Sequence, residues 1–186
     1  MVHLASLWLP ILVAAVIVFV ASSLIHMTPL WHKNDYPAMP REAEALAALR
    51  PLAIPQGDYF LPRAAGMKDM RTPAFQEKLK QGPVAVMTVM PNGMMNMSRS
   101  LMQWFVFLLV VGVFTGYVAC MSLPAGAPYP RVFRLVFTVA FVGYSLALCE
   151  LSIWYRRGWS LTLKGFLDGV IYAALTAGTF GWLWPR

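Results

Sequence analysis

Four long apolar runs constrain the fold of this chain more than any other feature of its sequence. The last two, Leu135–Tyr155 and Gly165–Pro185, contain one charged residue each. At ~1.5 Å per residue, a helix of either length crosses the ~30 Å hydrocarbon layer of a membrane once. Residues 156–164 between them suffice only for a turn, so we expect these two helices to be antiparallel neighbours.

The composition agrees with a protein that spans a membrane several times. Hydrophobic residues make up 59% of the chain and charged residues 12%, with a mean hydropathy of +0.59. Soluble domains contain ~25% charged residues. The net charge of +7 comes from basic residues scattered at the ends of the apolar runs, without the single basic face that nucleic acids require. We therefore expect the lipid bilayer as a partner, and no nucleic acid.

The pattern of runs predicts an all-α membrane protein with four transmembrane helices. We place these helices at residues 4–26, 101–122, 131–155 and 161–184. Residues 27–100 then form an extramembrane loop of α+β character between the first and second helices.

Several local signals lie within residues 27–100. Arg41–Leu49 is typical of a short amphipathic helix, and Thr72 followed by Pro73 predicts the start of another, with Thr72 as its N-cap. Val84–Met90 alternates as a strand does. Because prolines interrupt its apolar positions, a region of this size forms a poor domain by itself. We expect it to pack on the membrane surface or on a partner.

The basic residues near the helix ends favour one orientation in the membrane. More of them flank the long loop and the last turn than the opposite side, and positive residues favour the cytoplasm. We therefore predict that residues 27–100 lie in the cytoplasm and that both termini lie on the opposite side of the membrane. The residues compared are Lys33, Arg41, Arg99, Arg156, Arg157 and Lys164 against Arg131, Arg134 and Arg186.

Two carboxylates, Glu150 and Asp168, lie within the last two apolar runs near the same membrane face. Acidic groups inside a bilayer often mark a path for protons or cations. The alternative is an interfacial ion cluster, in which Lys164 pairs with Asp168 four residues along one helix, and Arg156 or Arg157 folds back toward Glu150. We expect the ion cluster, and keep the ion pathway as a second hypothesis.

Histidine and methionine offer candidate metal ligands. His26 and His32, with Met27, flank the end of the first apolar run, where their rings converge only if the chain turns at Pro29. A copper or haem site is one interpretation of these residues, and simple interfacial hydrogen bonding is the other. Thioethers suit Cu(I) or adaptable packing, and six of them cluster further along the chain: Met87, Met90, Met94, Met95, Met97 and Met102.

Small residues recur at intervals of four on two of the predicted membrane helices. This pattern lets helix backbones approach closely in lipid, either within one bundle or between two copies of a chain. The residues are Gly112 and Gly116 on one helix, and Gly165, Gly169, Ala173, Ala177 and Gly181 on the other.

Four segments of the sequence resemble a family of small bacterial four-span integral membrane proteins. They are SSLIHMTPLWHKNDYPAMP, GPVAVMTVMPNG, SIWYRRGWS and DGVIYAALTAGTFGWLWPR. The resemblance implies a bacterial origin and a four-span layout, and with the orientation above it implies a bacterial inner membrane protein with both termini in the periplasm. No function or site residue comes with it.

These observations favour a non-catalytic role. The chain has no plausible Ser–His–Asp or Cys–His set and no phosphate-binding glycine loop, so an enzyme is disfavoured. We expect an accessory or scaffolding subunit of a respiratory or photosynthetic membrane complex, bound to other membrane subunits or to itself. The alternatives are a small transporter or proton pathway through Glu150 and Asp168, and a metal-binding protein that uses His26, His32 and the methionines.

Overall fold

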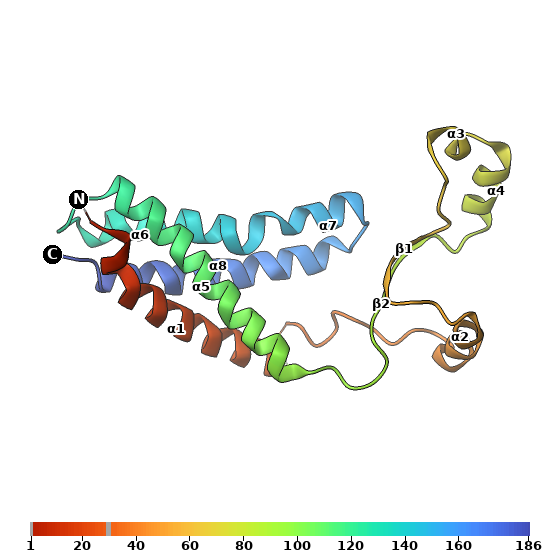
Figure 1. Cartoon of the computed structure of the whole chain (residues 1–186), viewed down its shortest axis with the longest axis horizontal. Coiled ribbons are helices and arrows are strands. Elements are labelled where there is room, and N and C mark those ends of the chain that lie inside the picture. The colour runs from red at the N-terminus through yellow and green to blue at the C-terminus, as the bar shows by residue number, and fades with distance from the viewer. Residues whose placement is uncertain (1, 29–30) are drawn as a thin grey trace. The chain divides into compact units, whose positions relative to one another are not determined.

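The computed structural model describes residues 2–28 and 31–186 (Figure 1). The chain forms two compact units. The first, which we call the helical unit, comprises the residues up to Tyr36 together with Asn96–Arg186. The second, the loop unit, is Pro37–Met95.

Long helices packed side by side form the helical unit, with both chain ends at one end of it (Figure 1). A 3-10 turn leads into α1, and a π-helical turn (Val142–Leu146) joins α6 to α7. The helices are α1 (Trp8–Met27), α5 (Met97–Ser122), α6 (Tyr129–Phe141), α7 (Leu148–Trp154) and α8 (Trp159–Trp182). Helix α5 begins before the predicted Leu101, because Asn96 caps it by accepting a hydrogen bond from the Arg99 amide.

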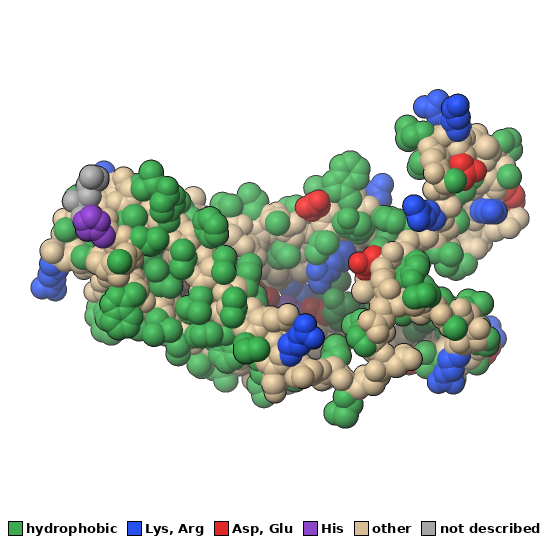
Figure 2. Space-filling view, in the orientation of Figure 1, with side chains coloured by type: hydrophobic (Ala, Val, Ile, Leu, Met, Phe, Trp, Pro, Cys, Tyr) green, Lys and Arg blue, Asp and Glu red, His purple; other side chains and the backbone are tan. Residues whose placement is uncertain are grey.

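Three helical segments are long and apolar enough to cross a membrane: Leu4–Met27, Met97–Ser122 and Tyr129–Trp154. The protein is therefore mostly helical, with three candidate membrane spans. Hydrophobic side chains cover much of the visible face of these helices, as expected of a surface that meets lipid (Figure 2).

Helix α8 is less apolar than these three segments, so the predicted fourth span is not confirmed. The helix packs against both α1 and α6 and buries Asp168 and three threonines along its length. A helix enclosed by other helices can be less apolar than one that faces lipid, because its polar groups find partners within the chain. This enclosure explains why α8 has a mixed composition.

The small residues singled out above lie where the helices of this chain meet. A Cβ atom added at Gly112 would lie 3.0 Å from Cγ2 of Ile11, so α5 and α1 are in close contact there. Gly116, one turn further along α5, faces Leu4 in the turn that precedes α1. On α8, Gly165 faces Leu148, Gly169 faces Ser145, Gly181 faces Tyr129, and Ala173 and Ala177 are fully buried.

The loop unit contains short elements and almost no core. Its elements are α2 (Glu42–Leu49), β1 (Gly57–Leu61), α3 (Met67–Met70), α4 (Pro73–Gln81) and β2 (Ala85–Val89). The two strands pair antiparallel, with Gly57 opposite Val89. The Thr72 hydroxyl accepts a hydrogen bond from the Phe75 amide, which confirms Thr72 as the N-cap of α4. Phe75 is the one buried hydrophobic side chain of this unit.

Thr115, in the middle of α5, is buried, and its hydroxyl has no hydrogen-bond partner among the described residues. Replacing it with valine, which has the same shape, should raise the free energy of unfolding by about 1 kcal/mol, because an unsatisfied polar group is removed. Thermal unfolding in detergent measures the change. As the control, Thr162→Val should lower stability, because Thr162 shares a 2.6 Å hydrogen bond with Ser152. A less stable Thr115→Val variant would show that the hydroxyl is satisfied.

Candidate metal centre

Asp168 is a buried acidic residue of the helical unit and lies at the centre of a polar cluster. It is on α8 with 5% of its surface exposed. Two side chains that follow α1 lie within hydrogen-bonding distance of its carboxylate. Nε1 of Trp31 lies 3.0 Å from Oδ1, and Nε2 of His32 lies 2.9 Å from Oδ2. These contacts hold the segment that follows α1 against α8.

His32 lies between two carboxylates. Its Nδ1 is 2.7 Å from Oδ2 of Asp35, while its Nε2 contacts Asp168. Each ring nitrogen of His32 therefore faces a carboxylate oxygen, and His32, Asp35 and Asp168 form one hydrogen-bonded unit.

Lys164 on α8 adds an ion pair to this network. Its Nζ donates to Oδ1 of Asp35 at 2.5 Å. The hydrogen bonds from Lys164 and His32 hold the pKa of Asp35 below its usual range. The ammonium group of Lys164 therefore supplies a positive charge to one of the two carboxylates of the cluster.

His26, in the last turn of α1, adds a second imidazole to the cluster. The centre of its ring lies 4.4 Å from that of His32, and the two planes are tilted by 34°. Its Nε2 is 3.4 Å from the hydroxyl of Tyr172 on α8. One ligand atom each from His26, His32 and Asp168 lies within 4.8 Å of the other two. Ligands of a tetrahedral zinc ion with bonds of ~2.1 Å lie ~3.4 Å apart, so small side-chain rotations bring these atoms to an ion.

The surroundings of the three side chains match those of a metal centre. Ligating histidines usually donate their second ring N–H to a carboxylate, which fixes the ring and the tautomer. Asp35 is in position to do this for His32, and Trp31 orients the carboxylate of Asp168 in the same way. Two imidazoles and one carboxylate suit Zn²⁺ and other divalent first-row transition metals, and they leave a coordination position open.

A cavity of about 500 Å³ lies beside His26, between α1 and α5. Its wall is mostly apolar, and Trp104 donates from Nε1 to the Ser22 hydroxyl at 2.9 Å within it. His26 is exposed and forms part of the wall of this cavity. The residues around it are Ser22, Ser23, His26, Met27, Met97, Leu101 and Trp104.

The predicted ion cluster differs from the one in the structure. Lys164 pairs with Asp35 instead of Asp168, and Arg157 lies 3.4 Å from the hydroxyl of Tyr36. Glu150 is exposed on α7, and its side chain has no hydrogen bond or ion pair within the described part of the chain. Arg156 has left-handed backbone geometry at the turn before α8. Asp168 therefore belongs with the histidines, and Glu150 takes no part in the network.

The predicted copper and haem ligands are also rearranged. His26 and His32 lie too close together for a porphyrin to fit between their rings. Met27 is 85% exposed on the wall of the cavity. The six clustered methionines are divided between the two units, and Met94 is fully exposed.

Sequence reasoning missed Trp31, Asp35 and Tyr172, and it assigned His32 and Asp168 to separate sites. One signal was present: Asp35 follows His32 by three residues, and both lie on the membrane face that Asp168 was predicted to approach. Comparisons of the chain with known protein families, curated proteins and solved structures give no match. The resemblance to small bacterial membrane proteins therefore stays a prediction, and the candidate metal centre is supported by the positions of its side chains alone.

Replacing Asp35 with asparagine should lower the free energy of unfolding at pH 7 by about 1 kcal/mol, because Lys164 and His32 lose a charged partner. A carboxyl whose pKa is lowered by folding stabilises the protein at neutral pH and loses this effect only as the pH falls through the lowered pKa, below ~3.9. Thermal unfolding should therefore separate the two proteins at pH 7, and the difference should begin to shrink only when the pH is lowered below ~3.9. Glu44→Gln is the control, because the Arg41–Glu44 pair lies exposed on the surface. An equal loss in that variant would contradict the assignment.

Proposed function

We propose that the protein is a membrane protein that binds one divalent transition-metal ion through His26, His32 and Asp168. One observation carries the proposal. The three ligand atoms lie within 4.8 Å of one another while Asp35 holds the second ring nitrogen of His32. Hydrogen bonds that served only to pack the helices together would not need two imidazole rings beside one buried carboxylate.

The proposal includes α8 as a fourth membrane crossing, with residues 27–100 and the turn before α8 in the cytoplasm of a bacterium. The network around Asp168 supports this arrangement. A buried carboxylate is costly within a membrane unless it is paired, and His32 supplies the pairing. The distribution of basic residues favours the cytoplasmic location of the long loop.

Metal binding at Nε2 of His32 requires this nitrogen to carry no proton, since a ligating imidazole is neutral. Affinity should therefore fall at acid pH. The open coordination position and the cavity beside His26 favour an ion that meets a further ligand. This arrangement is also compatible with a protein that hands the ion to a partner.

The experiment is metal analysis of the full chain purified in detergent. After removal of metals with a chelator and dialysis against Zn²⁺, we expect about one ion per chain in the wild type and in His3→Gln. His3 is a matched control because it lies before α1, at the opposite end from the cluster. His26→Gln and His32→Gln should retain less than about a tenth as much. A wild type without zinc, or a His32→Gln variant that binds as the wild type does, would falsify the proposal.

Copper binding through a thioether predicts a different outcome. If Met27 were a ligand, Met27→Leu would reduce the binding of Cu(I) and leave that of Zn²⁺ unchanged. In the site proposed here, Met27→Leu changes neither.

A second candidate function is that of an accessory subunit. Support comes from the loop unit, in which Phe75 is the one buried hydrophobic side chain while residues such as Met67 and Val84 are largely exposed. A unit with so small a core favours a partner that covers it. The small residues on α5 and α8 no longer support this idea, because helices of the same chain occupy their faces. Affinity purification of the native assembly tests it, and a monomer without partners would contradict it.

A further inference from the structure

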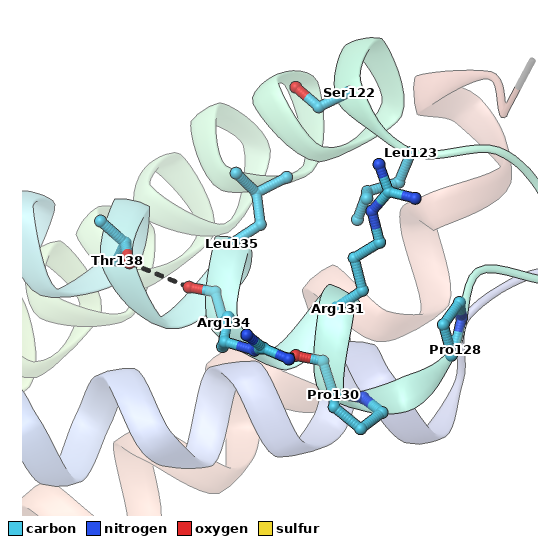
Figure 3. Close-up of a pocket in the computed structure, with 8 residues that line it drawn as sticks. All are labelled: Ser122, Leu123, Pro128, Pro130, Arg131, Arg134, Leu135 and Thr138. Carbon is cyan, nitrogen blue, oxygen red and sulfur yellow. Dashed lines mark hydrogen bonds between the residues drawn. The ribbon is translucent and has the colours of Figure 1, made fainter.

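A groove with two arginines lies at the end of the helical unit away from the metal centre (Figure 3). It has a volume of about 790 Å³ and runs between the end of α5 and the beginning of α6. The side chain of Arg131 extends from α6 toward Leu123, while that of Arg134 lies back along the helix, where its Nε donates to the carbonyl of Pro130 at 3.2 Å. Leu123 and Leu135 contribute apolar surface to the walls.

The positive charge of this groove is not neutralised within the described part of the chain. Neither Arg131 nor Arg134 has an ion-pair partner there. The sequence contains no acidic residue before Asp35 and none between Glu77 and Glu150, so α1, α5 and α6 have no carboxylate side chain. A guanidinium group presents paired N–H donors whose spacing matches the oxygens of a phosphate. An anion is therefore the complementary ligand.

We propose that Arg131 and Arg134 bind the phosphodiester headgroup of an anionic phospholipid. The position of the groove favours a lipid over a free anion. It lies at the end of two candidate membrane helices, and the leucines in its walls offer apolar surface to the upper part of an acyl chain. Basic pockets between membrane helices bind anionic headgroups in this way. The Ser122 hydroxyl, also in the wall, adds a hydrogen-bonding group.

The test is binding of phosphatidylglycerol to the delipidated full chain in detergent, measured by native mass spectrometry beside phosphatidylcholine. We expect phosphatidylglycerol to bind about tenfold more tightly than phosphatidylcholine. The double variant Arg131→Gln/Arg134→Gln should lose roughly 25-fold in affinity for phosphatidylglycerol, a factor of about five for each charge. Arg131→Lys should lose less, because it keeps the charge and loses the paired donors.

The double variant Arg63→Gln/Arg71→Gln is the control, since it removes the same charge from exposed positions of the loop unit. It should bind phosphatidylglycerol as the wild type does. Equal binding of the two lipids to the wild type, or unchanged binding in the Arg131→Gln/Arg134→Gln variant, would overturn the proposal. Displacement of phosphatidylglycerol by millimolar inorganic phosphate would also overturn it, by assigning the groove to a soluble anion.

Discussion

Replacing Asp168 with asparagine should abolish metal binding and destabilise the metal-free protein. The variant loses a charged ligand, and zinc affinity should fall by more than about 100-fold, because even the loss of an outer partner costs 10- to 100-fold. In the metal-free protein, the amide oxygen still accepts from Trp31, but it is uncharged, and the contact with His32 loses its charged partner. The weaker hydrogen bonds should lower the free energy of unfolding by about 1 kcal/mol. Zinc titration and thermal unfolding measure the two effects separately.

Glu150→Gln is the matched control for this prediction. Glu150 is exposed and takes no part in the network, so its substitution should change neither zinc affinity nor stability by a measurable amount. If the function were ion transport through both carboxylates, each of the two variants would reduce the ion flux into vesicles. Unchanged zinc binding in Asp168→Asn would contradict the site.

Replacing Gly169 with alanine should cost more stability than any other Gly→Ala change in α8. The π-helical turn Val142–Leu146 brings Ser145 against α8 at this position. An added Cβ would lie 1.5 Å from Oγ and 2.9 Å from Cβ of Ser145. The hydroxyl can rotate away, but the Cβ of Ser145 is fixed to the backbone, so the helices must separate. Overpacking of this kind costs about 1–3 kcal/mol, and it displaces the neighbouring Asp168 from His32.

Thermal unfolding and zinc affinity should both decrease in Gly169→Ala, and Ser145→Gly should restore part of each. Gly178→Ala provides the control on the same helix, because the nearest atom to its added Cβ is the Tyr129 hydroxyl at 3.7 Å. Alanine is the better helix former, so the control should gain up to about 1 kcal/mol. A Gly169→Ala variant as stable as Gly178→Ala would show that the two helices are not in close contact.

The periodic features of the chain could be predicted from its sequence. The helical segments and their approximate ends follow from runs of apolar residues and from local signals such as the Thr72 cap. The close packing of α5 on α1 follows from the spacing of Gly112 and Gly116. Each of the last two apolar runs contains one charged residue, so the prediction did not separate α8 from the three segments that are more apolar.

The candidate site depends on contacts between residues far apart in the chain. Asp168 lies 136 positions from His32, and Lys164 lies 129 positions from Asp35. The local rule that pairs residues four apart on a helix linked Lys164 to Asp168. In the structure, the segment after α1 approaches α8 and supplies stronger partners to both. No pattern within one helix contains this information.

X-ray absorption spectroscopy of the zinc-loaded protein tests the metal centre most directly, because it reports the atoms bound to the ion. The account predicts nitrogen and oxygen ligands at ~2.0–2.1 Å with scattering from two imidazole rings. The His32→Gln variant, loaded at the same zinc concentration, should lose that spectrum. A wild-type spectrum with sulfur at ~2.3 Å, or without imidazole, would contradict the assignment of His26, His32 and Asp168 as the ligands.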